Sequence, residues 1–125
     1  MDLKKLLYIK FIPVVIIAQT LYFKFIGAPE SMYIFMELGV EPAGRIFTAI
    51  METIAVILML YPRSLWLGAL TATGLMGGAI LSHLFILGIE IQDDGGMLFT
   101  LAIISFLTSS FTLYLEKSKI PYLKL

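Results

Sequence analysis

The chain has 125 residues, of which 59% are hydrophobic and 14% are charged, and its mean hydropathy is +0.94. A soluble domain of this size cannot bury so much apolar surface, so the composition indicates a membrane protein. Nine basic and nine acidic residues leave no net charge, which excludes the electrostatic attraction that nucleic-acid binding requires. The absence of cysteine excludes disulfides, thiolate metal sites and Fe–S clusters, so any redox role would need a bound cofactor or a partner.

The apolar stretches predict an all-α membrane protein, a four-transmembrane-helix bundle that forms one domain over residues 1–125. Four stretches are long enough to cross a bilayer: residues 6–26, 44–61, 64–88 and 97–115. The basic start of the chain resembles a secretion signal, but the apolar run continues past Tyr22 without a cleavage motif, so we expect a retained first span. Only Pro62 and Arg63 separate the second span from the third, which predicts an antiparallel hairpin.

The connection between the first two spans contains a second kind of element, a short helix at residues 30–38. Pro29 is a typical first helical residue, the stretch that follows is mostly apolar, and Gly39 and Pro42 end it. We expect this helix to lie in the outer membrane interface. An irregular loop that covers the bundle is the alternative.

The distribution of Lys and Arg predicts the orientation, because cytoplasmic loops are enriched in both. The basic residues on one side of the spans are Lys4, Lys5, Arg63, Lys117, Lys119 and Lys124. The carboxylates on the other side are Glu30, Glu37, Glu41, Glu90, Asp93 and Asp94, with Lys24 and Arg45 as exceptions. We therefore expect a multi-pass protein of the plasma (cytoplasmic) membrane with both termini in the cytoplasm.

Small residues in the third span predict close helix packing, since little hydrophobic force acts between helices in lipid. Two surfaces of this span are smooth. The first surface carries Gly74, Gly78 and Ser82, and the second carries Gly68, Ala72 and Ala79. Contact between helices is the simpler interpretation, and a flat ligand lying against the backbone is the alternative.

Three polar side chains from three different spans lie at similar depth in the outer half. With the usual helical rise, Glu52 lies about 12 Å below the outer end of its span, Gln19 about 10 Å and His83 about 7 Å. Ionisable groups that face lipid cost several kcal/mol, so we expect Glu52 and His83 to point inward. Arg45 and Thr48 share a helical stripe with Glu52, and the fourth span offers the hydroxyl of Thr100.

This predicted cluster has two interpretations. Glu52, Gln19 and His83 could form a structural clamp in which they satisfy one another's hydrogen bonds and lock the helices together. They could equally line a pocket, in which a carboxylate near an imidazole binds a cation, bonds a quinone or sterol oxygen, or passes a proton. One His beside one Glu supplies too few ligands for a transition metal, and Asp93 and Asp94 lack the spacing of a calcium loop, so no metal site is predicted.

Four pieces of the chain, in order and spacing, resemble the DoxX-like group of small four-helix membrane proteins. These pieces are Phe35–Pro42, Met51–Thr53, Leu67–Leu70 and Met76–His83. The resemblance implies a bundle of the kind shared with sterol-binding EXPERA-type proteins and a receptor chaperone group, with Glu52 and His83 at the pocket. The family name derives from a subunit of a thiosulfate-oxidising quinone reductase, but the absence of cysteine speaks against thiol-based catalysis here.

Our leading hypothesis is a non-enzymatic membrane module that binds a small lipophilic ligand, a quinone among the candidates, or assists a partner membrane protein. A homodimer is a further partner hypothesis. The alternative is an accessory subunit of a quinone-linked redox complex. A proton-coupled small-molecule transporter is the third class, although small multidrug exporters carry their glutamate in the first span and Glu52 lies in the second.

Overall fold

The computed structural model describes residues 3–119, which are helical or in turns, with no β-strand in that range. The elements are α1 (Leu3–Leu6), the 3-10 helix η1 (Leu7–Lys10), α2 (Phe11–Ile26), α3 (Pro29–Glu37), α4 (Ala43–Leu60), α5 (Leu65–Ser82), the π-helical η2 (His83–Leu87), α6 (Met97–Leu115) and the 3-10 helix η3 (Lys117–Lys119). Four helical stretches are long and apolar enough to cross a membrane: Lys4–Ile26, Ala43–Leu60, Leu65–Leu87 and Met97–Leu115. The predicted all-α architecture, its four spans and the short extra helix are confirmed.

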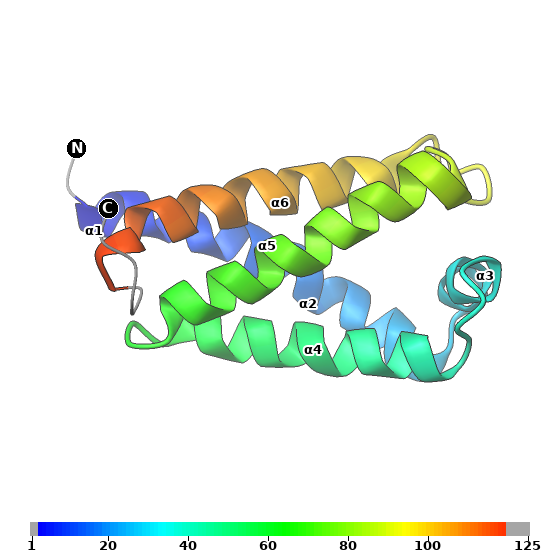
Figure 1. Cartoon of the computed structure of the whole chain (residues 1–125), viewed down its shortest axis with the longest axis horizontal. Helices are drawn as coiled ribbons and strands as arrows, with labels where there is room; N and C mark the ends of the chain where they lie inside the picture. Colours follow the sequence, from blue (N-terminus) through cyan, green and yellow to red (C-terminus); the bar gives the residue numbers. More distant parts are fainter. Residues whose placement is uncertain (1–2, 120–125) are drawn as a thin grey trace.

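The four long helices lie side by side along the long axis of the molecule (Figure 1). α3 lies at one end of the bundle, near the connection between α5 and α6. α1 and the turn between α4 and α5 lie at the opposite end. The two ends therefore differ in construction, because among residues 3–119 only the end with α3 carries a complete α-helix outside the four candidate spans.

The hairpin of α4 and α5 depends on one glycine at its closed end. A Cβ atom on Gly68 would lie 2.7 Å from the backbone nitrogen of Met59 and 2.8 Å from the carbonyl oxygen of Ala55, so the two backbones touch here. A Cβ on Gly74 or Gly78 would meet nothing within 4 Å. Within residues 3–119, Gly74 and Gly78 therefore make no close helix contact, and the surface that carries Gly68 contacts α4.

Most of the core lies in the half of the bundle near the α4–α5 turn. Its buried apolar residues are Val14, Ile17, Ala55, Met59, Leu65, Ala69, Ala72, Met76 and Ala102. α6 adds small polar side chains, since Ser105, Ser109 and Thr112 are fully buried. Small residues allow helices to approach closely in a membrane, which accounts for the dense packing of this half.

The connection between α5 and α6 is organised by the carboxylate of Asp94. Partial burial alone would raise the pKa of Asp94, but hydrogen bonds from the backbone N–H groups of Ile91, Leu98, Gly96 and Met97 outweigh this effect. The pKa of Asp94 therefore lies below its ordinary value of 3.8. Three of these bonds, from Ile91, Gly96 and Leu98, measure 3.0, 2.8 and 3.2 Å. Asp94 thus caps the start of α6, and the turn is not merely solvated.

Asp94→Asn is expected to destabilise the protein by about 1 kcal/mol, because the charged cap is lost. A carboxylate whose folded pKa is lowered contributes stability above its unfolded pKa, and this contribution disappears as the pH falls through the folded value. Thermal unfolding in detergent, from about pH 7 down to about pH 3, should show the difference between wild type and Asp94→Asn shrinking toward the acid end. Asp93→Asn is the matched control, because Asp93 is exposed; a pH-independent difference for Asp94→Asn would contradict the capping role.

Candidate ligand cavity

A cavity of about 130 Å³ lies inside the bundle, in the half nearer α3. Helices α2, α3, α4, α5 and α6 and the η2 turn all contribute to its wall, which is mainly apolar. The polar residues of the wall are Thr20, Lys24, Thr48, Glu52, Ser82 and His83. α3 closes over this cavity, because Ile34, Phe35 and Leu38 line it.

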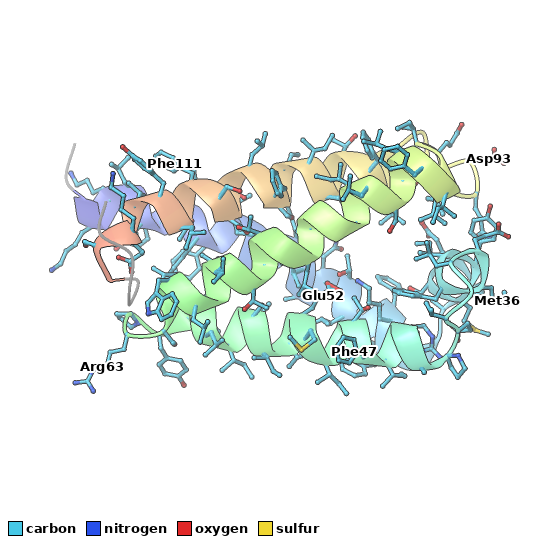
Figure 2. The ribbon with its side chains drawn as sticks, viewed as in Figure 1. Met36, Phe47, Glu52, Arg63, Asp93 and Phe111 are labelled. Atoms are coloured by element: carbon cyan, nitrogen blue, oxygen red, sulfur yellow. The ribbon has the colours of Figure 1, made fainter. Side chains whose placement is uncertain are left out.

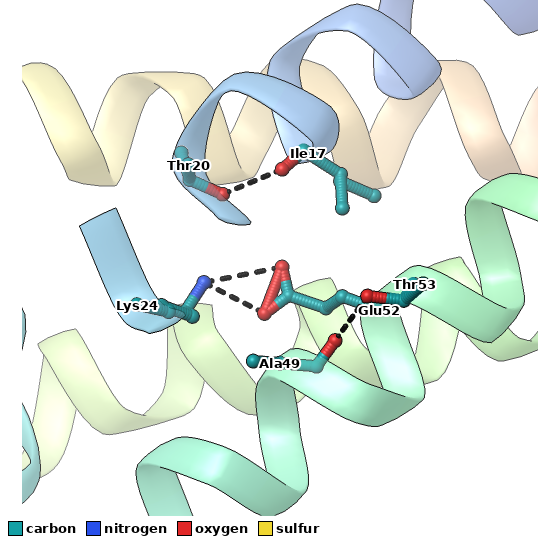
Figure 3. A network of polar contacts seen from close by, with 6 residues as sticks. All are labelled: Ile17, Thr20, Lys24, Ala49, Glu52 and Thr53. Carbon is teal, nitrogen blue, oxygen red and sulfur yellow. Dashed lines mark hydrogen bonds and ion pairs between the residues drawn. The ribbon is translucent and has the colours of Figure 1, made fainter. Parts of the chain in front are cut away.

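An ion pair between α2 and α4 is the most strongly charged feature of the wall. The Lys24 Nζ atom lies 2.6 Å from Glu52 Oε1 and donates a 3.1 Å hydrogen bond to Glu52 Oε2 (Figure 3). The Glu52 side chain is 1% exposed and the Lys24 side chain 17%. Both carboxylate oxygens therefore contact the ammonium, and each retains a further lone pair that can accept a hydrogen bond. Figure 2 shows Glu52 pointing between the helices.

The backbone of Lys24 is held by a second residue of α4. The Arg45 guanidinium donates a hydrogen bond to the Lys24 carbonyl oxygen, and Arg45 Nε donates to the Glu41 carboxylate at 2.9 and 3.1 Å. Gly27, in the left-handed conformation with φ +69, ends α2 directly against this guanidinium. Arg45 is buried but does not line the cavity. Its predicted place in the pocket is therefore corrected: Arg45 caps the carboxyl end of α2.

His83 begins the π-helical turn η2 and is 5% exposed. Its Nδ1 lies 2.9 Å from the carbonyl oxygen of Gly88, whose own N–H donates back to the His83 carbonyl at 2.7 Å. The ring of Phe99 from α6 meets the imidazole edge to face, with 5.4 Å between ring centroids. The imidazole is thus fixed in orientation by the chain around it.

The structure brings Glu52, Thr48 and His83 to one cavity, and it places Gln19 and Thr100 elsewhere. Gln19 is exposed, because α2 turns Ile17, Thr20 and Lys24 inward. Thr100 is also exposed, and its hydroxyl donates to the Gly96 carbonyl at 2.8 Å. The predicted convergence was wrong for these two residues, since equal depth in a bilayer does not fix the direction in which a helical side chain points.

Lys24 is the most important wall residue that the sequence interpretation missed. It was assigned to the outer surface because it lies near the end of the first span. A sequence signal was present, since Ile17, Thr20 and Lys24 are spaced by three and four residues on one helical face. A lysine side chain is also long enough to reach a carboxylate deeper in the membrane.

A second cavity of about 110 Å³ adjoins the first beneath α3. Both cavities are lined by Lys24 and Phe35, so these two side chains stand between them. Glu30 and Ser31 from α3 line only the second cavity. Glu30 thus adds a carboxylate to the second cavity, whose wall is otherwise mainly apolar.

Comparison with protein-family models, curated proteins and solved structures finds no match to this chain. Within residues 3–119, no group of three or more His, Asp or Glu side chains could hold a metal ion. Fold and site together define a small helical membrane protein with four candidate spans and an internal, mainly apolar cavity that contains a buried ion pair.

Proposed function

We propose that this protein is a non-enzymatic membrane module that binds a small lipophilic molecule in the main cavity. One observation carries the proposal: an apolar wall encloses the Lys24–Glu52 pair and leaves room beside it. Ligand sites usually combine a mostly apolar wall with a few polar groups that orient the ligand. A buried ion pair is costly to maintain in a membrane and contributes little stability, which favours a functional role for it.

The resemblance to the DoxX-like group supports the same proposal, because Glu52 and His83, the positions carried over from that group, both line the cavity. In this proposal the ion pair anchors the polar end of the ligand, and the apolar side chains hold its body. A module of this kind would either retain its ligand or present it to a partner membrane protein.

Filling the cavity is the direct test of this function. Ala79→Phe is expected to lose the lipophilic molecules that co-purify with wild type, because Ala79 lines the cavity. Mass spectrometry of organic extracts from the purified proteins makes the comparison. Ala18→Phe is the matched control, since Ala18 is exposed on α2. Circular dichroism establishes that both variants are helical.

Equal lipid recovery from wild type, Ala79→Phe and Ala18→Phe would contradict the proposal. A quinone that is lost only from Ala79→Phe would assign the protein to the alternative class, an accessory subunit of a quinone-linked redox complex. A sterol-like molecule lost in the same way would favour the non-enzymatic module.

We further propose that both termini lie in the cytoplasm and that the end carrying α3 faces outward, in the plasma membrane. Two basic residues depart from the charge asymmetry, and both are paired with carboxylates: Lys24 with Glu52, and Arg45 with Glu41. Because both positive charges are neutralised by these carboxylates, Lys24 and Arg45 add little net positive charge to the α3 end. Lys124, also used in the prediction, lies outside the described residues.

The absence of native cysteine allows the orientation to be measured directly. Single variants Asp93→Cys and Ser118→Cys place a thiol at exposed positions on opposite ends of the bundle. A membrane-impermeant maleimide added to intact cells is expected to label Asp93→Cys only. Permeabilised cells, in which both should react, provide the control; labelling of Ser118→Cys alone in intact cells would reverse the orientation.

A further inference from the structure

The protonation of the His83 imidazole follows from its partner. A carbonyl oxygen can only accept a hydrogen bond, so the 2.9 Å contact with the Gly88 oxygen requires hydrogen on Nδ1. In a neutral imidazole the other nitrogen, Nε2, then carries a lone pair. Within the described part of the chain, the bond to Gly88 is the only hydrogen bond of this ring. Nε2 is therefore an open acceptor on a residue that lines the cavity.

The charges of the cavity wall are already paired. Its ionisable wall residues are Lys24, Glu52 and His83, and the first two already neutralise each other. Glu30 lines the second cavity, on the far side of Phe35.

The other polar groups of the wall also present acceptors. The hydroxyl hydrogen of Thr20 is donated to the Ile17 carbonyl at 2.8 Å, and that of Ser82 to the Gly78 carbonyl at 2.9 Å, which leaves only oxygen lone pairs. Glu52 also has oxygen lone pairs left to accept. The Lys24 ammonium has three N–H groups and donates one of them to Glu52 Oε2, so it remains a hydrogen-bond donor of the wall. Only Thr48 retains a hydroxyl that can turn to donate, among the described hydroxyls of the wall.

From the unpartnered Nε2 of His83 we propose that the cavity selects neutral lipophilic molecules that carry a hydroxyl group, such as alcohols and phenols, with this nitrogen accepting the hydroxyl hydrogen. The inference rests on the ligand-binding function proposed above and adds the chemical class of the ligand. An ether or carbonyl compound of the same shape leaves these acceptors unpaired, which is costly in a buried site. For a quinone-like lipid the same chemistry favours the reduced, hydroxyl-bearing form.

Two probes that differ by one O-methyl group, which removes the hydrogen-bond donor, provide the test: 2-naphthol and its methyl ether, 2-methoxynaphthalene. Isothermal titration calorimetry with the protein in lipid nanodiscs is expected to show 2-naphthol binding about tenfold more tightly than the ether. His83→Phe should lower the affinity for 2-naphthol to that for the ether. The affinity for the ether should be unchanged. Gln19→Leu, which alters an exposed polar residue of α2, should preserve the wild-type preference.

The outcomes separate this inference from the function on which it rests. Equal binding of both probes by wild type, or tighter binding of the ether, overturns the hydroxyl preference while the cavity remains a lipophile site. Binding of neither probe contradicts the ligand-binding function and this inference together. If His83→Phe fails to fold, the wild-type ratio still decides the preference; a folded His83→Phe that keeps this ratio overturns the assignment of His83 as the acceptor.

Discussion

Glu52→Leu is expected to destabilise the protein by about 3 kcal/mol, because it leaves the Lys24 ammonium buried without a counterion. The Lys24 side chain is 17% exposed, and its backbone is fixed by Arg45, so the ammonium cannot move far toward water. Lys24→Met should have a similar effect by leaving the carboxylate alone. The double variant Lys24→Met/Glu52→Leu should recover most of the loss, because replacing a whole buried pair by apolar residues is often neutral.

Thermal unfolding of the four proteins in one detergent, monitored by circular dichroism, measures this coupling. Glu37→Leu is the control for losing an exposed carboxylate and should change the stability little. Strictly additive losses in the double variant would show that Lys24 and Glu52 do not stabilise each other. The ion pair would then no longer support a ligand anchor in the cavity.

The second large effect is expected at Gly68, where α4 and α5 touch. A Cβ at this position would lie 2.6 Å from the Met59 Cγ and within 2.8 Å of backbone atoms of Met59 and Ala55, so Gly68→Ala must push the helices apart. We expect a loss of about 2 kcal/mol, typical of overpacking against rigid atoms. Gly74→Ala introduces the same methyl group where nothing lies within 4 Å, and should be neutral or slightly stabilising because alanine favours helix.

The pair Gly68→Ala and Gly74→Ala is matched in helix, residue type and added volume. Their unfolding temperatures in detergent therefore differ only through the surroundings of the new methyl group. A larger loss for Gly74→Ala would indicate that this face is covered in the protein as purified, and that the α4–α5 contact tolerates expansion.

The spans could be predicted because length and hydropathy determine which segments cross a bilayer, independently of how the helices pack. The hairpin of α4 and α5 followed from the two residues Pro62 and Arg63, and α3 from Pro29 and Gly39. These signals are local in the sequence, so they can be interpreted without knowing which helices pack against one another.

The candidate site was predicted less completely, because it depends on rotation of each helix about its axis. Depth along the bilayer was estimated from the helical rise and grouped Gln19 with Glu52, but Gln19 faces outward. Likewise, from the sequence the surface with Gly68 and the surface with Gly74 were equally suitable for helix packing. Only the structure shows that Gly68 contacts α4 and that Gly74 does not. Lys24 was missed because a charged residue near the end of a span usually extends toward water.

The solid packing of one half of the bundle has a consequence for how molecules move. Val14, Ala55, Met59, Leu65 and Ala69 fill the interior between the cavity and the α4–α5 turn, so the cavity is blind at that end. A ligand in this cavity therefore has no open path along the bundle axis to the α4–α5 end. Transport of a molecule from one side of the membrane to the other would require these packed side chains to separate.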